Sequence, residues 1–333
     1  MPGESTLRPA HTHMPNDYCV STTFMLLISF VCCCSSLLPA SSKWESIIEK
    51  DVPRTYPTHK LFAKGSSTGR DKLQRVLKAT ALHVPEIGYV QGMNFIAAYF
   101  LAETGDEETS FWLLVRVLHG KEYKFYDLYG ENLSRLWVAA YQVQHCLNQN
   151  DPALALHFAK IKVNILAWLP QWILTIFTKH LKPPHMNALV EIFLQEGWPL
   201  LIKASVAILM IHRDKVLTLS FDRMLPYLNG VVGKPEQEQE DVWHAIDLGE
   251  VVKMLDKVQL PNLRKLEEEM AGKSNEERNA LIEGSMIRSS KYISAKVTET
   301  VNNKNTFIKS AVYAGLFMAA AVIGGAVISK ARR

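Results

Sequence analysis

The chain has 333 residues, of which 48% are hydrophobic and 21% are charged. This balance suits a globular protein with one large core or two modest ones, and it excludes disorder as the main state. The formal net charge is only +4, and no lysine- and arginine-rich block is interleaved with aromatic residues. We therefore expect no nucleic acid partner.

The cysteines do not form a disulfide pattern. Cys32, Cys33 and Cys34 are contiguous, Cys19 lies nearby, and Cys146 stands alone. No set of paired spacings can be read from these positions. The usage fits a body that faces a reducing compartment such as the cytosol.

A short apolar segment, FMLLISFVCCCSSLLPA, runs from Phe24 to Ala40 and is interrupted by Pro39. A secretory signal would need positive charge just before it, and the preceding residues offer only Arg8 and two histidines. Two interpretations stay open: a membrane-contacting segment whose cysteine cluster can be palmitoylated, or a stretch with no folded role. We assign residues 1–43 to a divergent N-terminal segment.

The body of the chain shows the periodicity of successive helices. Asp71–Val84 carries an apolar stripe at helical spacing and is followed by Pro85. A second helix is predicted from Met93 to about Glu103. A third begins near Asp106, whose side chain can cap it.

Two longer apolar stretches, Leu154–Leu181 and Trp198–Ile211, resemble membrane spans at first sight. Pro170 splits the first stretch, and Lys203 lies inside the second. Neither leaves an uninterrupted uncharged span near the roughly 20 residues that a bilayer requires, so we interpret both as core helices. No stretch alternates like a strand for long enough to indicate a sheet. The predicted fold class is all-α.

The composition changes after Gly230. An acidic run over residues 236–241 indicates a surface loop or helix cap, and Val242–Met270 has the apolar spacing of helices that close the domain. Residues 271–306 are polar and rich in serine, lysine and asparagine, which is typical of a stalk.

The C-terminal end has the layout of a tail anchor. Ala311–Ile328 (AVYAGLFMAAAVIGGAVI) carries no charge, is close to the minimum length for a bilayer span, and is flanked by basic residues. A helix packed on the domain is the alternative, but no polar stripe recurs to face water. We predict a transmembrane anchor over residues 307–329. A short span with a basic tail is compatible with the endoplasmic reticulum, the mitochondrial outer membrane or the peroxisome, because length and hydrophobicity sort proteins only loosely. Of these destinations we favour the endoplasmic reticulum or another endomembrane.

Two short motifs carry the chemistry: Ile48–Arg54 (IEKDVPR) and Tyr89–Gly92 (YVQG). Hydrolysis of GTP by a GTPase requires a cation against the charge that develops on the transferred phosphoryl group, and an amide that orients the attacking water. Arg54 offers a forked, permanently charged guanidinium, and Gln91 offers an amide that both donates and accepts. The two residues are therefore candidate catalytic groups for a reaction on a partner.

In this order and spacing, the motifs resemble the IxxDxxR and YxQG fingers of the TBC family of Rab GTPase-activating proteins. The resemblance extends over roughly Trp44–Gly230, and we assign the TBC domain to residues 44–270. It implies that Arg54 stabilises the transition state while Gln91 replaces the catalytic glutamine of the GTPase. The supporting residues that it implies are Ile48, Asp51, Tyr89, Gly92 and Asn94.

The resemblance implies a protein that accelerates GTP hydrolysis by a Rab-type GTPase in membrane trafficking. It would perform no nucleotide chemistry of its own and need no cofactor, because the partner binds GTP and Mg²⁺. The chain departs from the family pattern at Leu189–Gly197 (LVEIFLQEG), where a usual tryptophan is missing, and ahead of the first finger, where the usual helices are missing. Because the helices ahead of the first finger are missing, an inactive, membrane-tethered Rab-binding scaffold is the alternative, and a multi-span membrane protein is a distant third.

Overall fold

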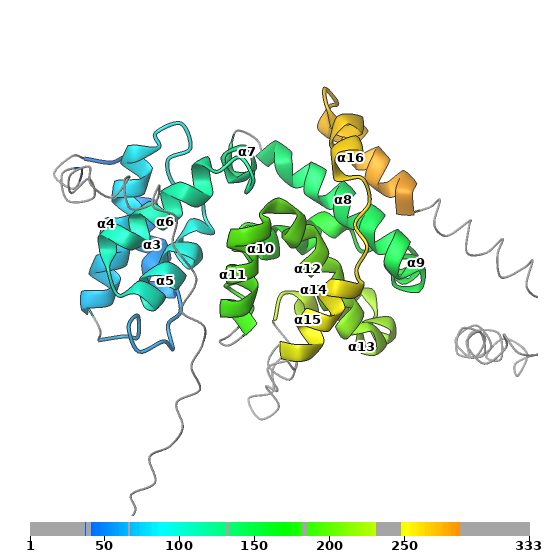
Figure 1. Ribbon diagram of the computed structural model, residues 1–333, viewed down its shortest axis with the longest axis horizontal. Helices are drawn as coiled ribbons and strands as arrows, with labels where there is room; N and C mark the ends of the chain where they lie inside the picture. The colour runs from blue at the N-terminus through cyan, green and yellow to red at the C-terminus, as the bar shows by residue number, and fades with distance from the viewer. Residues whose placement is uncertain are drawn as a thin grey trace, which may run out of the picture. The chain divides into compact units, whose positions relative to one another are not determined.

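The computed structural model describes residues 37, 41–65, 67–130, 133–181, 185–230 and 248–286. Every regular element within these ranges is a helix, which confirms the predicted all-α class (Figure 1). The chain divides into two compact units, residues 1–117 and 118–333.

The first unit contains the two predicted finger motifs. Its helices are α3 (Glu45–Asp51), the 3₁₀ turn η1 (Val52–Arg54), α4 (Ser67–His83), α5 (Met93–Thr104) and α6 (Glu107–His119), whose last residues pass into the second unit. The helix predicted over Asp71–Val84 is thus confirmed as α4, with an earlier start.

The packing of the first unit follows from the apolar stripe on α4. Leu73, Val76 and Leu77, at positions i, i+3 and i+4, are fully buried. Arg75 on the other side of α4 makes a bidentate ion pair with Glu107, at 2.8 and 2.7 Å, which joins α4 to the start of α6. As predicted, the side chain of Asp106 caps α6 by accepting a 2.7 Å hydrogen bond from the amide of Thr109.

The second unit is a larger helical assembly. In chain order its elements are α7 (Phe125–Tyr129), α8 (Ser134–Asn150), α9 (Pro152–Ile161), η3 (Ile165–Ala167), α10 (Leu169–Ile173), α11 (His185–Glu196), α12 (Trp198–Ile211), α13 (Arg213–Thr218), α14 (Phe221–Leu228), α15 (Leu248–Lys257) and α16 (Leu263–Met270). The prediction of helices within Val242–Met270 is confirmed by α15 and α16.

Helix α12 lies at the centre of the second unit. It packs against α8, α10, α11, α13 and α15, and most of its side chains are buried. This confirms that the apolar stretch Trp198–Ile211 is a core helix. Lys203 is tolerated because its ammonium stays partly exposed and lies 4.0 Å from the carboxylate of Glu196.

The other long apolar stretch is broken into short elements. Pro170 occupies the first turn of α10, where its missing N–H is harmless, and Trp168 and Trp172 are fully buried beside it. Across the described part of the chain, no helix combines the length and the apolar character needed to cross a membrane.

The folded body extends beyond Met270. Residues 275–286 are helical, and Ile282 and Met286, one turn apart, are buried. The side chain of Asn148 on α8 donates a 3.3 Å hydrogen bond to the carbonyl of Ser285. These residues, which fall within the predicted stalk over 271–306, are thus docked on the second unit by the buried Ile282 and Met286 and by hydrogen bonds from Asn148 and Asn164. Residues 287–306 of the predicted stalk, the predicted anchor over 307–329 and the acidic run at 236–241 lie outside the described residues.

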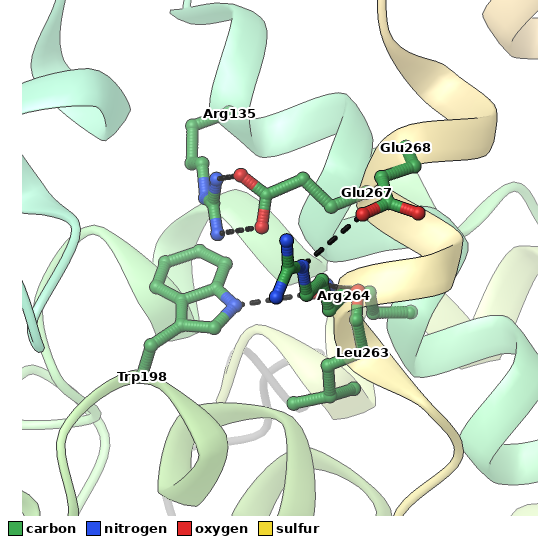
Figure 2. A network of polar contacts seen from close by, with 7 residues as sticks. Arg135, Trp198, Leu263, Arg264, Glu267 and Glu268 are labelled. Carbon is green, nitrogen blue, oxygen red and sulfur yellow. Dashed lines mark hydrogen bonds and ion pairs between the residues drawn. The ribbon is translucent and has the colours of Figure 1, made fainter.

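A partly buried polar network fastens α16 to the rest of the second unit (Figure 2). Both terminal nitrogens of Arg135 pair with the carboxylate of Glu267, and its guanidinium carbon lies 4.8 Å from the ring centroid of Trp198. The indole N–H of Trp198 donates to Gln142, which in turn donates to the carbonyl of Leu263, each at 2.8 Å. The network holds α16 on α8 and the start of α12.

Candidate functional site

The first motif forms a short helix that tightens at its end. Ile48, fully buried, anchors α3 in the core of the first unit. Pro53 lies in the 3₁₀ turn η1, where its fixed φ is compatible with the tighter winding. This turn ends at Arg54, whose side chain is 53% exposed. The guanidinium is thus attached to a rigid base and accessible to a partner.

Asp51 is the buried centre of the site. It is only 3% exposed, and its Oδ1 lies 2.5 Å from Nη2 of Arg54. Its Oδ2 accepts a 2.6 Å hydrogen bond from the hydroxyl of Tyr89, which is also buried. One carboxylate therefore joins the arginine of the first motif to the tyrosine of the second.

Two glycines shape the loop that carries Gln91. Gly88 has φ +67, and a Cβ at this position would lie 2.2 Å from the ring of Trp44. Gly92, at the start of α5, has φ +121, a backbone conformation that residues other than glycine rarely adopt. Between them Gln91 is exposed. The loop therefore presents an amide to solvent from a close-packed backbone.

A second polar connection runs through Asn94, which is fully buried at the start of α5. Its Oδ1 accepts a 3.0 Å hydrogen bond from the amide of Gly92, and its Nδ2 donates a 2.7 Å hydrogen bond to Oγ1 of Thr55. The Thr55 hydroxyl donates in turn to the carbonyl of Asp51 at 2.7 Å. Two segments that are distant in sequence are thereby hydrogen-bonded to each other through Asp51–Tyr89 and Thr55–Asn94, and the hydroxyl of Tyr56 adds a 3.3 Å hydrogen bond to the carbonyl of Phe95. We call this set the finger-loop network; it comprises Asp51, Arg54, Thr55, Tyr89, Gly92 and Asn94.

The structure joins the two segments that carry the predicted site residues. The predicted supporting residues Asp51, Tyr89, Gly92 and Asn94 belong to the finger-loop network, and Ile48 is packed beneath it. Arg54 and Gln91 are exposed on the two segments that this network joins.

Two further residues shape the site and were not predicted from the sequence: Thr55, which belongs to the finger-loop network, and Trp44, which packs against Gly88. Thr55 directly follows the arginine of the first motif, and its hydroxyl, next to that arginine, could have indicated a hydrogen-bonding role. The role of Trp44 could not be inferred from the sequence, because its ring meets Gly88 only after the chain has folded back.

The family model for the Rab-GTPase-TBC domain matches residues 34–217. The match covers more than half of the chain, and the chain belongs to the RabGAP-TBC family.

Curated relatives share this part of the chain. The chain is 27% identical to the ecotropic viral integration site 5 ortholog of Drosophila melanogaster over 232 residues, which cover 70% of this chain and 28% of the relative. It is 28% identical over 256 residues to the Rab GTPase-activating protein eat-17 of Caenorhabditis elegans, covering 76% of this chain and 28% of the relative. The chain therefore spans only about a quarter of the length of such relatives.

Solved structures share the fold. The TBC domain of the Chlamydomonas flagellar RabGAP superposes with a TM-score of 0.55 at 24% identity, covering 68% of this chain and 70% of that one. The Ypt/Rab-GAP domain of Gyp1p superposes with a TM-score of 0.51 at 17% identity, covering 68% and 76% of the two chains.

Proposed function

We propose that this protein is a GTPase-activating protein for a Rab-type small GTPase, and that it supplies Arg54 and Gln91 to the active site of its partner. The observation that carries the proposal is the finger-loop network, which joins the two motifs while leaving both side chains exposed. Family membership supports it, as do relatives that are themselves named Rab GTPase-activating proteins.

Arg54 would act on the charge that develops during phosphoryl transfer. A guanidinium can bridge the phosphate oxygens, and arginine fingers supplied in trans contribute about 10³ to 10⁵ in rate. Asp51 holds the Arg54 side chain at one nitrogen, which leaves its other donors available to the partner. The buried carboxylate thus limits the conformations of the finger before the partner arrives, which lowers the entropic cost of ordering it.

Gln91 would orient the attacking water. Its amide can accept a hydrogen bond from the water while donating to a phosphate oxygen, without placing another charge beside the nucleophile. The glycines on either side of it allow the loop backbone to approach the partner closely. GTP and Mg²⁺ would be bound by the GTPase, so this chain would contribute side chains and no nucleotide site.

We also propose, on the sequence alone, that residues 307–329 anchor the protein in an endomembrane with the body on the cytosolic side. Protease digestion of sealed microsomes tests this topology. An antibody to the body should lose its epitope without detergent, while a short C-terminal fragment stays with the membrane pellet. Protection of the body would exclude a cytosolic Rab as partner and favour a multi-span protein.

The activity is tested by phosphate release from a panel of GTP-loaded Rab proteins, using the purified full-length chain. We expect stimulation of at least one Rab, with a loss of about 10³-fold in Arg54→Ala and a comparable loss in Gln91→Ala. Arg223→Ala and Gln195→Ala remove exposed side chains of the same types from the second unit and should retain the activity.

Two other results would overturn the proposal. Full stimulation by Arg54→Ala and Gln91→Ala would exclude both residues as fingers. A folded protein that stimulates no Rab but binds one in its GTP form would instead be a membrane-tethered Rab-binding scaffold.

A further inference from the structure

We infer that Thr55 is a positioning residue, which couples the arginine-bearing turn to the glutamine-bearing loop. The inference rests on the proposed function, because it assigns Thr55 a role in presenting Arg54 and Gln91 together. It starts from the two hydrogen bonds of one hydroxyl group, to Asp51 and from Asn94.

The Thr55 hydroxyl makes hydrogen bonds within the protein both as a donor and as an acceptor. It donates to the carbonyl of Asp51 and accepts from Nδ2 of Asn94, both at 2.7 Å, and the residue has no exposed surface. Asn94 is equally buried. A hydroxyl in this position therefore cannot exchange its partners for bulk water, and its removal leaves a buried amide donor unpaired.

The path through Thr55 connects backbone with backbone. It begins at the Asp51 carbonyl, where α3 passes into η1, and ends at the amide of Gly92, directly after Gln91. Two other connections join the segments: Tyr89 to Asp51 links side chains, and the hydroxyl of Tyr56 donates a 3.3 Å hydrogen bond to the carbonyl of Phe95 in α5. Without Thr55 these two links would remain, but the amide of Gly92, directly after Gln91, would no longer be tied to the turn that presents Arg54.

Positional coupling of this kind matters because both fingers must reach one phosphoryl group. A displacement of about 1 Å in a catalytic constellation can lower a rate by about 10²-fold. Binding of a GTPase, by contrast, depends on a surface much wider than two side chains. The loss of Thr55 should therefore lower kcat more than it raises KM for the GTP-loaded Rab.

Thr80 provides a matched control in the same unit. It is 1% exposed, and its hydroxyl donates a 2.8 Å hydrogen bond to the carbonyl of Val76, four residues earlier, as Thr55 does to Asp51. It lies within α4, outside the finger-loop network. Thr80→Val thus removes a buried hydroxyl of similar geometry without breaking the link between the finger segments.

The kinetic experiment compares full-length variants on a stimulated Rab. We expect Thr55→Val to lower kcat by about 10- to 100-fold while KM changes less than about two-fold. Thr55→Ser keeps the hydroxyl and should restore kcat, whereas Thr80→Val should match the parent protein. Thr55→Ala also removes the hydroxyl but introduces no methyl group in its place, and it should reproduce the Thr55→Val result. Equal kcat in Thr55→Val and the parent would overturn the inference.

A second readout does not depend on activity. In hydrogen exchange followed by mass spectrometry, peptides that cover residues 88–95 should exchange faster in Thr55→Val than in the parent, Thr55→Ser and Thr80→Val. Unchanged exchange would overturn the coupling even if every variant stimulates a Rab. Faster exchange in a protein that stimulates no Rab would support the coupling and reject only the proposed function.

Discussion

The hydroxyl of Tyr89 donates a 2.6 Å hydrogen bond to Oδ2 of Asp51, and both residues are buried. This hydrogen bond joins the second finger motif to Asp51, the carboxylate that pairs with Arg54 in the first finger motif. The exposed arginine is consequently positioned in part by a residue that lies far from it in the sequence.

Tyr89→Phe should weaken both stability and activity. Loss of a hydrogen bond to a buried carboxylate costs about 1.5–3 kcal/mol of unfolding free energy. We also expect a lower kcat, because Asp51 would be less firmly oriented toward Arg54. Urea unfolding and phosphate release measure the two effects.

Tyr123→Phe is the control for that comparison. Its hydroxyl donates a 2.9 Å hydrogen bond to the neutral carbonyl of Leu194 in the second unit. We expect a cost of about 1 kcal/mol and an unchanged kcat. An equal kcat in both tyrosine variants would argue against a role of Tyr89 in presenting the finger.

Gly88→Ala and Gly105→Ala separate backbone strain from steric conflict. The two glycines have almost the same φ, +67 and +68, so an alanine meets a similar left-handed penalty of about 1 kcal/mol at each. A Cβ at Gly88 would lie 2.2 Å from the ring of Trp44, whereas nothing lies within 4 Å at Gly105.

We therefore expect Gly88→Ala to lower the free energy of unfolding by roughly 2–4 kcal/mol and Gly105→Ala by only about 1 kcal/mol. Gly88→Ala should also reduce Rab stimulation, because the displaced loop carries Gln91. Similar unfolding midpoints for the two variants would show that Trp44 moves aside without cost.

Two neighbouring glutamates on α16 should differ sharply in their contribution to stability. Glu267 pairs with Arg135, whose side chain is 6% exposed, while Glu268 pairs at 3.1 Å with Arg264, which is 90% exposed (Figure 2). The hydrogen bond from Arg135 also holds the pKa of Glu267 below its usual value.

Glu267→Ala should cost about 3 kcal/mol, because it leaves a buried guanidinium without its counter-ion. Glu268→Ala should cost at most about 0.5 kcal/mol, because both members of its pair are hydrated. Thermal and urea unfolding of the two variants test this difference. Equal destabilisation would contradict the assignment of α16 to the folded core.

The second unit should lose stability in mild acid through His180. Burial lowers the pKa of His180 to about 3, from an ordinary value of 6.5, and the neighbouring Lys179 acts in the same direction. Below pH 6.5 the unfolded chain takes up a proton that the folded chain does not. The free energy of unfolding therefore falls by about 1.4 kcal/mol for each pH unit until the pH approaches the folded value.

His180→Gln should flatten this pH dependence, measured by urea unfolding between pH 7 and pH 5. His119→Gln, at an exposed position, serves as the control and should leave the slope as it is. Burial also lowers the pKa of His157 and His212, so some acid sensitivity should persist in His180→Gln. An unchanged slope in that variant would exclude His180 as its source.

Much of the architecture could be predicted because its signals are local. The bounds predicted for Trp198–Ile211 coincide with those of α12, and Asp106 caps α6 as its side chain predicts. Both features depend on residues within a few positions of one another. The docking of residues 275–286 escaped prediction, because only two of its buried side chains, Ile282 and Met286, are apolar, and two such residues in a polar segment carry little periodic signal.

The sequence by itself determined the helical class and the two motifs, including the candidates Arg54 and Gln91. Only the tertiary structure decided how the motifs are held: that Asp51 is shared by Arg54 and Tyr89, and that Thr55 and Asn94 form a second link. These contacts join residues that are distant along the chain, and their geometry is set when α5 and the α3–η1 segment pack in the first unit. Helix periodicity and side-chain chemistry act over neighbouring residues, whereas the burial that makes one hydroxyl irreplaceable exists only after folding.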